Sequence, residues 1–85
     1  MNLSGILVVA APGRLDDVLA GLATLAGVEV HQIDAATGRI VVVQEAPSVD
    51  AETDGFTRIK SLPGVIDAAL VYHRLDDPGA SAADA

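Results

Sequence analysis

The chain has 85 residues, 51% of them apolar, and a formal net charge of −7 at pH 7. A chain of this length and composition is expected to fold as one globular domain with a modest core, because a disordered chain would be less apolar. Its acidity repels nucleic acid and anionic membrane surfaces and favours a cationic partner, so we expect no nucleic-acid binding.

The pattern of apolar residues predicts neither a membrane span nor an export signal. No apolar run approaches the roughly 20 residues that cross a bilayer, so we expect no stable membrane insertion. The first charged side chain is Arg14, which follows the first apolar run, whereas a signal peptide begins with positive charge. The chain has no cysteine for a disulfide or a thiolate metal site. We therefore expect a cytoplasmic protein.

The first half of the chain predicts a strand, a helix and a hairpin. Residues 4–11 (SGILVVAA) are apolar and β-branched and predict a strand that ends at Pro12-Gly13. From Arg14 onward apolar residues recur at helical spacing and two aspartates occupy the first turn, which indicates a helix that ends at Gly27. Residues 28–35 and 39–46 predict two strands joined by a turn around residues 37–38.

The second half predicts one more helix and one more strand. Ser48 is the expected N-cap of the helix, and Gly55 inside it costs about 1 kcal/mol relative to alanine. Residues 64–75 (GVIDAALVYHRL) predict the last strand, and residues 76–85 (DDPGASAADA) predict a disordered acidic tail. The apolar stripe of the second helix is predicted to be Val49, Thr53, Phe56 and Ile59.

The predicted order βαββαβ indicates an α+β fold of the ferredoxin-like type within residues 1–75. In this sandwich one four-stranded antiparallel sheet carries both helices on one face and leaves the other face open. A faint internal repeat supports two βαβ halves, since LAGVEV (25–30) and LPGVID (62–67) both place Leu-x-Gly-Val between a helix and a strand.

Strand alternation divides the side chains between the two faces of this sheet. The residues predicted to face the helices are Ile6, Val8, Ala10, Val28, Val30, Ile40, Val42, Ile66, Ala68, Leu70 and Tyr72. The residues predicted to face away from them are Leu7, Val9, Ala11, Glu29, His31, Val41, Val43, Glu45, Asp67, Ala69, Val71 and His73. An uncovered apolar floor with an acidic rim is typical of a partner site, and it suits a peptide that is basic at one end.

The sequence carries no recognisable catalytic, metal-binding or cofactor-binding motif. His31 and His73 lie on different predicted strands without a metal-ligand spacing, and no phosphate-binding loop is present. Ser4, Ser48 and Ser61 have no evident base and are best explained as cap or loop residues. We therefore expect a protein that is not an enzyme and that holds no metal and no cofactor.

Three stretches resemble the NapD family: SGILVVA at the start, GVEVHQIDAATGRIVVVQEA in the middle and GVIDAALVYHRLDD at the end. The resemblance covers roughly residues 4–77, and residues 70–73 (LVYH) followed by acidic residues are its most specific part. It implies a cytoplasmic assembly chaperone of the periplasmic nitrate reductase. Such a chaperone binds the twin-arginine signal peptide of the catalytic subunit, NapA, and delays export by the Tat translocase until the molybdenum cofactor is inserted.

With this resemblance, the residues expected to bind the signal peptide are those of the predicted open face. We expect the two arginines to meet the acidic rim and the apolar stretch to lie on the valine floor, and we expect the free protein to be a monomer. The predicted peptide-binding residues are Leu7, Val9, Glu29, His31, Val41, Val43, Glu45, Asp67, Val71 and His73.

Two other classes of protein share the predicted order of elements. ACT and Lrp-type (RAM) effector-binding domains bind small ligands such as amino acids at dimer interfaces, and their first helix is similar to residues 12–28. Against them stand the LVYH ending and the absence of an attached DNA-binding or catalytic domain. A metallochaperone of the same fold is disfavoured, because the first loop (AAPGRL) has no Cys-x-x-Cys.

Overall fold

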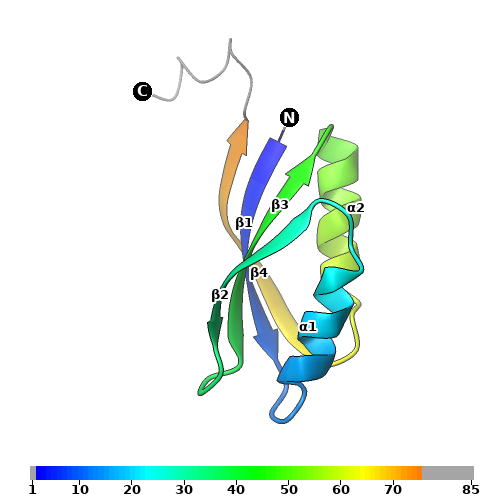
Figure 1. Cartoon of the computed structure of the whole chain (residues 1–85). Coiled ribbons are helices and arrows are strands. Elements are labelled where there is room, and N and C mark those ends of the chain that lie inside the picture. The colour runs from blue at the N-terminus through cyan, green and yellow to red at the C-terminus, as the bar shows by residue number, and fades with distance from the viewer. Residues whose placement is uncertain (1, 76–85) are drawn as a thin grey trace.

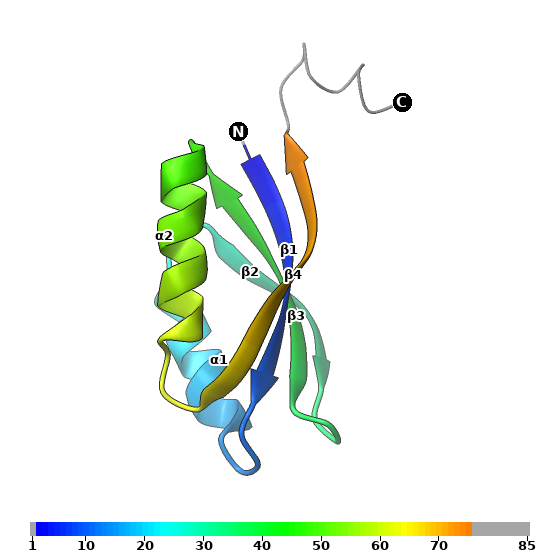
Figure 2. The same ribbon diagram turned by 180° about the vertical axis from the view of Figure 1, so that it is seen from behind.

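The computed structural model describes residues 2–75, and for residues 73–75 it describes the backbone only. All neighbouring strands are antiparallel in the order β2-β3-β1-β4, and both helices lie on one face of the sheet (Figures 1 and 2). The predicted fold is confirmed, while the predicted tail (76–85) lies outside the described residues. The elements are β1 (Asn2–Ala10), α1 (Leu15–Ala23), β2 (Val28–Asp34), β3 (Arg39–Ala46), α2 (Val49–Lys60) and β4 (Val65–Leu75).

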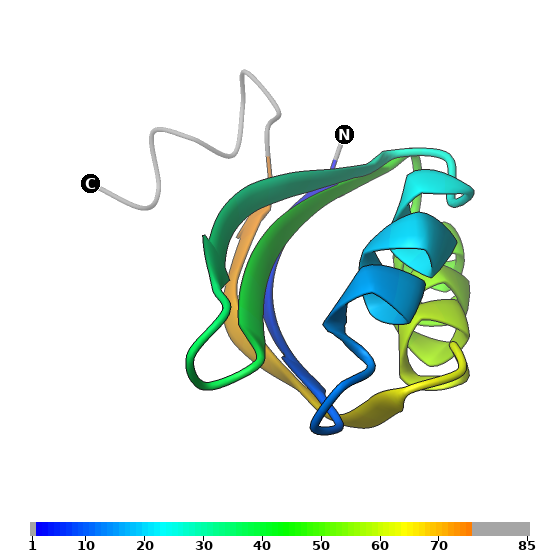
Figure 3. The same ribbon diagram turned by 60° about the horizontal axis from the view of Figure 1, so that its bottom comes forward.

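The sheet is curved, and the two helices lie inside the curve (Figure 3). The face away from the helices, which we call the open face, is therefore convex. The core lies between the concave face and the helices. Its buried members are Ile6, Val8, Ala10, Val18, Leu22, Ile40, Val42, Ile59 and Ala68.

The helices begin where the sequence predicts. Asp16 and Asp17 lie in the first turn of α1, where the helix dipole favours negative charge. The Ser48 hydroxyl accepts a hydrogen bond from the backbone N–H of Ala51 at 3.1 Å, which confirms Ser48 as the N-cap of α2. The predicted apolar stripe of α2 is wrong at its first two positions, because Val49 is 61% exposed and Thr53 is also exposed.

The internal repeat in the sequence corresponds to two equivalent loops. Gly27 and Gly64 both have positive φ angles, of 78° and 92°, which glycine adopts without strain. The carbonyl of Gly27 accepts a hydrogen bond from the Glu45 N–H, and that of Gly64 from the Ala11 N–H, each at 2.7 Å. Helix α1 ends before this loop, with Thr24 as its C-cap, so Gly27 connects the loop to β3 instead of stopping the helix.

Gly55 allows α2 to pack closely on β3. A Cβ at this position would overlap Oε1 of Gln44, whose side chain is 2% exposed and lies beneath the helix. The Gln44 amide donates a hydrogen bond to the Glu52 carbonyl at 2.9 Å, and its Oε1 atom has no hydrogen-bond partner among the described residues. The glycine that lowers helix propensity thus leaves the space that the buried Gln44 amide occupies between helix and sheet.

Candidate functional site

The open face is assigned first from the two inner strands, β1 and β3, because they pair with each other without a bulge. Their pairing runs from Asn2–Ala46 to Val9–Arg39 with no shift in register. Ile6, Val8, Ile40 and Val42 are fully buried under the helices, and the side chains between them point the other way. As predicted, the open face therefore includes the half-buried side chains of Leu7, Val9, Val41 and Val43.

Strand β4 departs from strict alternation at two β-bulges. Asp67, Ala68, Ala69 and Leu70 pair in register with β1, but Ile66 and Val71 are extra residues without a partner there. Asp67 and Ala69 lie on the open face as predicted, because they pair with Val9 and Leu7. Ile66 was predicted to face the core and is instead 64% exposed, while Val71 is 61% exposed.

Beyond the second bulge the facing of β4 is reversed. Leu70 pairs with Ile6 on the helical side as predicted, although it is 55% exposed. Tyr72 pairs with Gly5, and a Cβ added to Gly5 would overlap the Tyr72 ring. Because Gly5 lies between Ser4 and Ile6, which are both buried on the helical side, its Cβ position points to the open face. The prediction that Tyr72 faces the core is therefore wrong.

The reversed facing of β4 also applies at His73, which was predicted to be a site residue. It pairs with Ser4, one position beyond the pair of Tyr72 and Gly5. Its side chain lies outside the described part of the structure. The Ser4 hydroxyl is buried on the helical side and donates a hydrogen bond to the Glu52 carboxylate of α2.

Strand β2 carries a third irregularity, at His31. Val30 pairs with Val42 and Gln32 pairs with Val41, so His31 is the extra residue between them. His31 is exposed as predicted, but Gln32 is the residue opposite Val41 on the open face. Strict alternation misses Gln32 because it places every second residue on the same face, and the unpaired His31 shifts that order by one residue.

The predicted acidic rim is divided between the two ends of the open face. Glu29 pairs with Val43 and Glu45 with Leu3, so these two glutamates lie near each other at one end. Asp67 pairs with Val9, six residues of β1 beyond Leu3, which corresponds to about 20 Å. Its carboxylate accepts a hydrogen bond from the Ala68 N–H at 2.9 Å. Asp67 is therefore too far away to act with the two glutamates on one side chain.

Each end of the open face has a hollow beside β2. The first, which we call the acidic hollow, has a volume of about 500 Å³ and carries both glutamates on an apolar lining. It is lined by Leu3, Gly27, Val28, Glu29, Val43 and Glu45. The second, which we call the far hollow, has a volume of about 480 Å³ and contains a cationic side chain. It is lined by Leu7, Gln32, Ile33, Asp34, Arg39 and Val41.

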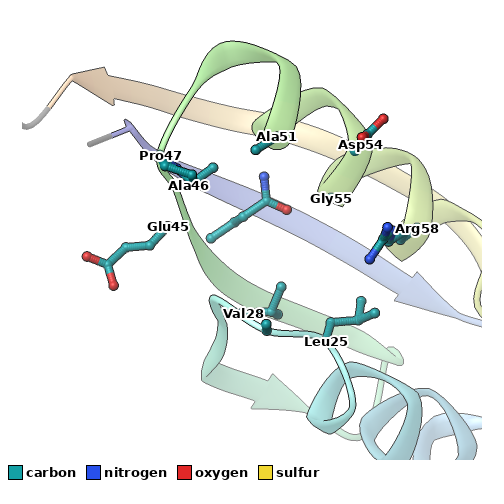
Figure 4. Close-up of a pocket in the computed structure, with 11 residues that line it drawn as sticks. Leu25, Val28, Glu45, Ala46, Pro47, Ala51, Asp54, Gly55 and Arg58 are labelled. Atoms are coloured by element: carbon teal, nitrogen blue, oxygen red, sulfur yellow. The ribbon is translucent and has the colours of Figure 1, made fainter.

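A smaller cavity of about 210 Å³ lies on the other side of β3, beneath α2 (Figure 4). Leu25 and Val28 line one side of it, and Gly55 and Arg58 of α2 line the other. Glu45 stands at its margin and directs its carboxylate away from the helix. This cavity adjoins the acidic hollow, with which it shares the lining residues Val28 and Glu45.

The described residues offer little for metal chemistry or for a membrane span. Within residues 2–75 the described His, Asp and Glu side chains form no group of three that could hold a metal ion. No helix in this range is both long and apolar enough to cross a bilayer.

Comparisons with known proteins identify relatives along nearly the whole chain. The family model described as "NapD protein" matches residues 1–77. "Chaperone NapD" of Escherichia coli (strain K12) is 30% identical over 78 residues, which are 92% of this chain and 90% of that protein. "Chaperone NapD" of Paracoccus pantotrophus is 35% identical over 75 residues, which are 88% and 65%. The solution structure of the E. coli Tat proofreading chaperone protein NapD matches with a TM-score of 0.78 and 28% identity, over 91% of this chain and 81% of that one.

Proposed function

The chain belongs to the NapD family, and from this premise we propose that it is a Tat proofreading chaperone for the maturation of the periplasmic nitrate reductase. In this proposal it acts in the cytoplasm and without catalysis. It binds the twin-arginine signal peptide of the catalytic subunit, NapA, on the open face. The bound peptide is withheld from the Tat translocase until the molybdenum cofactor is inserted.

The acidic hollow is the observation that carries the proposed binding site. Glu29 and Glu45 lie there on neighbouring strands of a face that no helix of the chain covers. Carboxylates are the preferred partners of guanidinium groups, with which they form paired, charge-assisted hydrogen bonds. Leu3 and Val43 line the same hollow, so the methylene groups of an arginine would lie on apolar side chains while its charge meets the glutamates.

The remaining open face supports one direction for the bound peptide. Leu7, Val9 and Val41 continue from the acidic hollow along the inner strands, and Arg39 lies at the far end. Two carboxylates, Asp34 and Asp67, share that end with Arg39, whereas the acidic hollow has two carboxylates and no cation among its lining residues. The arginines of the peptide therefore lie at the acidic hollow, and the apolar stretch extends toward the far hollow. The distance of about 20 Å between the two ends accommodates roughly 13 residues of α-helix.

Titration calorimetry with a synthetic signal peptide of NapA tests this proposal. We expect binding that weakens in part as salt rises, because exposed charges are screened while the apolar contacts remain. Replacing both arginines by lysine should weaken binding less than replacing both by glutamine, since lysine keeps the charge and loses only the two-pronged hydrogen bonding. No binding of the unmodified peptide would overturn the proposed function. Equal affinity of all three peptides at low salt would overturn the role of the glutamates.

A matched pair of protein variants locates the arginines on the face. The double variant Glu29→Gln/Glu45→Gln should reduce both the affinity and the difference between the arginine and glutamine peptides. Asp67→Asn changes the charge of a carboxylate on the same face, about 20 Å away, and should leave that difference intact. The opposite result would place the arginines at the Asp67 end. Thermal stabilisation by free amino acids, without peptide binding, would favour an ACT-like or RAM-like effector domain.

A further inference from the structure

Two unusual features of the backbone combine to place an aromatic ring on the open face. The β-bulge at Val71 reverses the facing of β4, so that Tyr72 leaves the helical side. Gly5, directly opposite in the central strand β1, has no side chain, and the ring occupies the space that a Cβ would fill. Without the bulge Tyr72 would face the helices, and with any other residue at position 5 the ring would have to lie elsewhere.

Both features lower the stability of the sheet, so stability alone does not account for them. A bulge interrupts the ladder of hydrogen bonds, and a glycine inside a strand weakens it. Bulges occur preferentially where a side chain has to be redirected toward a functional surface. The ring that results is 46% exposed, so covering Gly5 does not bury it.

The position of the ring relates it to the acidic hollow. Glu29, Val43, Gly5 and Tyr72 form one row across the four strands, so Tyr72 lies at the same level of the sheet as the glutamate proposed to hold an arginine. Ala69 and Leu7, which pair with each other, form part of the next row toward the far hollow. A peptide that runs along β1 therefore passes beside the ring where its basic end gives way to its apolar stretch.

We propose that Tyr72 is a specificity-determining contact for the signal peptide, an inference that rests on the proposed function. Gly5 leaves the space in which the Tyr72 ring lies on the open face. The ring provides a flat apolar surface for the start of the apolar stretch that follows the two arginines. Aromatic side chains of this kind contribute much of the affinity of peptide and protein interfaces, because they bury a large area at low cost in conformational entropy. The alternative role for Tyr72 is purely structural, as a cover for Gly5.

The composition of the chain supplies a direct reporter of this contact. Tyr72 is the only tyrosine, and the chain has no tryptophan. The tyrosine fluorescence of the protein therefore comes from Tyr72 alone, and a NapA signal peptide synthesised with phenylalanine in place of any tyrosine or tryptophan adds none. We expect this peptide to change the emission and to protect it from quenching by acrylamide, with the same midpoint that calorimetry gives.

Variants separate the contact from the structural role. Tyr72→Ala should weaken peptide binding about tenfold or more, whereas Tyr72→Phe should stay within about twofold, because the ring and not the hydroxyl makes the contact. Gly5→Ala should weaken binding by displacing the ring, and it should add little to the loss in Tyr72→Ala, since both changes remove one interaction. Val49→Ala is the control, because Val49 is an exposed apolar residue of the helical layer.

The outcomes distinguish this inference from the proposed function itself. If calorimetry shows that the peptide binds while the emission and quenching of Tyr72 stay unchanged, the role of Tyr72 is refuted and the chaperone function stands. Unaltered affinity in a folded Tyr72→Ala variant with a lowered urea midpoint would assign Tyr72 the structural role alone. If the peptide does not bind at all, both proposals fail. Should Gly5→Ala not fold, Tyr72→Ala and the fluorescence of the unaltered protein decide the question.

Discussion

The two faces of the sheet carry similar apolar side chains but bury them to very different extents. Val42 is completely buried beneath the helices, whereas Val43, its neighbour in β3, is only half-buried on the open face. The same contrast separates Ile6 from Leu7 in β1. Folding thus uses the apolar residues of one face, and those of the other remain available for a partner. This comparison predicts that substitutions on the two faces affect different measurements.

The largest effect is expected for a charge placed in the middle of the open face. Leu7→Asp should reduce the affinity for the signal peptide at least about 100-fold, because an unpaired carboxylate buried on binding costs several kcal/mol. Titration calorimetry measures the loss, and circular dichroism should show unchanged helix and strand content. Val49→Asp, which adds the same charge to the helical layer, should bind normally. Normal binding by a folded Leu7→Asp variant would move the site away from this face.

The adjacent valines of β3 provide the most direct test of the comparison. Val42→Ala should lower the free energy of unfolding by about 2–3 kcal/mol, because it removes a fully buried side chain from the core. Val43→Ala should lower it by less than about 1 kcal/mol and should instead weaken peptide binding. Urea denaturation and calorimetry of the two variants measure both quantities. Equal losses of stability would show that the open face contributes to the fold as much as the helical face.

A smaller effect is predicted where α2 packs on the buried face of the sheet, and there the change in the free energy of unfolding has the opposite sign to the usual one. In most helices Gly→Ala is stabilising by about 1 kcal/mol. Gly55→Ala should instead lower the free energy of unfolding by about 1–2 kcal/mol, because the new methyl group overlaps the buried Gln44 amide. Thr57→Ala, at an exposed position of the same helix, should be stabilising by a few tenths of a kcal/mol. In a Gln44→Ala background, a Gly55→Ala change that still destabilises would contradict this explanation.

The smallest effect is expected for residues 78–85, which follow the described part of the chain. Deleting residues 78–85 should change the free energy of unfolding and the peptide affinity by no more than a few tenths of a kcal/mol, because these residues are small or acidic and offer no core side chain. Denaturation and calorimetry of the shortened chain check both values. A tenfold loss of affinity would show that Asp84, the one acidic side chain in the deleted segment, helps to hold the basic end of the peptide.

The elements of the fold follow from local sequence signals. Apolar spacing changes from a period of two to a helical period at Arg14 and again after Ser48, and the glycines at 27, 38 and 64 allow the positive φ angles of the loops. The inner strands alternate without interruption, so their facing could be predicted residue by residue. In β3 this gave the correct face for all five positions that the alternation assigned between Ile40 and Glu45.

The outer strands could not be predicted in the same way, because each contains a bulge. Residues 68–72 (AALVY) are apolar at every position, so inserting one unpaired residue leaves the hydrophobic pattern unchanged. The reversal of Tyr72 and the exposure of Ile66 follow from this. One signal was present in the sequence, since Gly5 interrupts an apolar strand and such a glycine often marks a close approach by another group.

The facing of the three acidic residues was predicted correctly, but their arrangement on the open face was not. Glu29, Glu45 and Asp67 were correctly assigned to the open face, yet their grouping depends on which residues lie opposite one another in the sheet. That register comes from the pairing between strands, which a pattern within one strand does not contain. The division into an acidic hollow and a far hollow therefore appears only in the folded chain.

Asn2 lies opposite both Ala46 in β3 and Leu75 in β4, so the two ends of the described chain meet at the end of the sheet that holds the acidic hollow (Figure 1). A signal peptide fused to Asn2 through a flexible linker would reach Glu29 and Glu45 within its own molecule. For a short linker the effective concentration is in the millimolar range, which is enough to saturate a weak site. A tag rich in lysine or arginine at this position would compete for the same carboxylates. Fusion and tag removal are thus the two practical ways to control occupancy of the hollow.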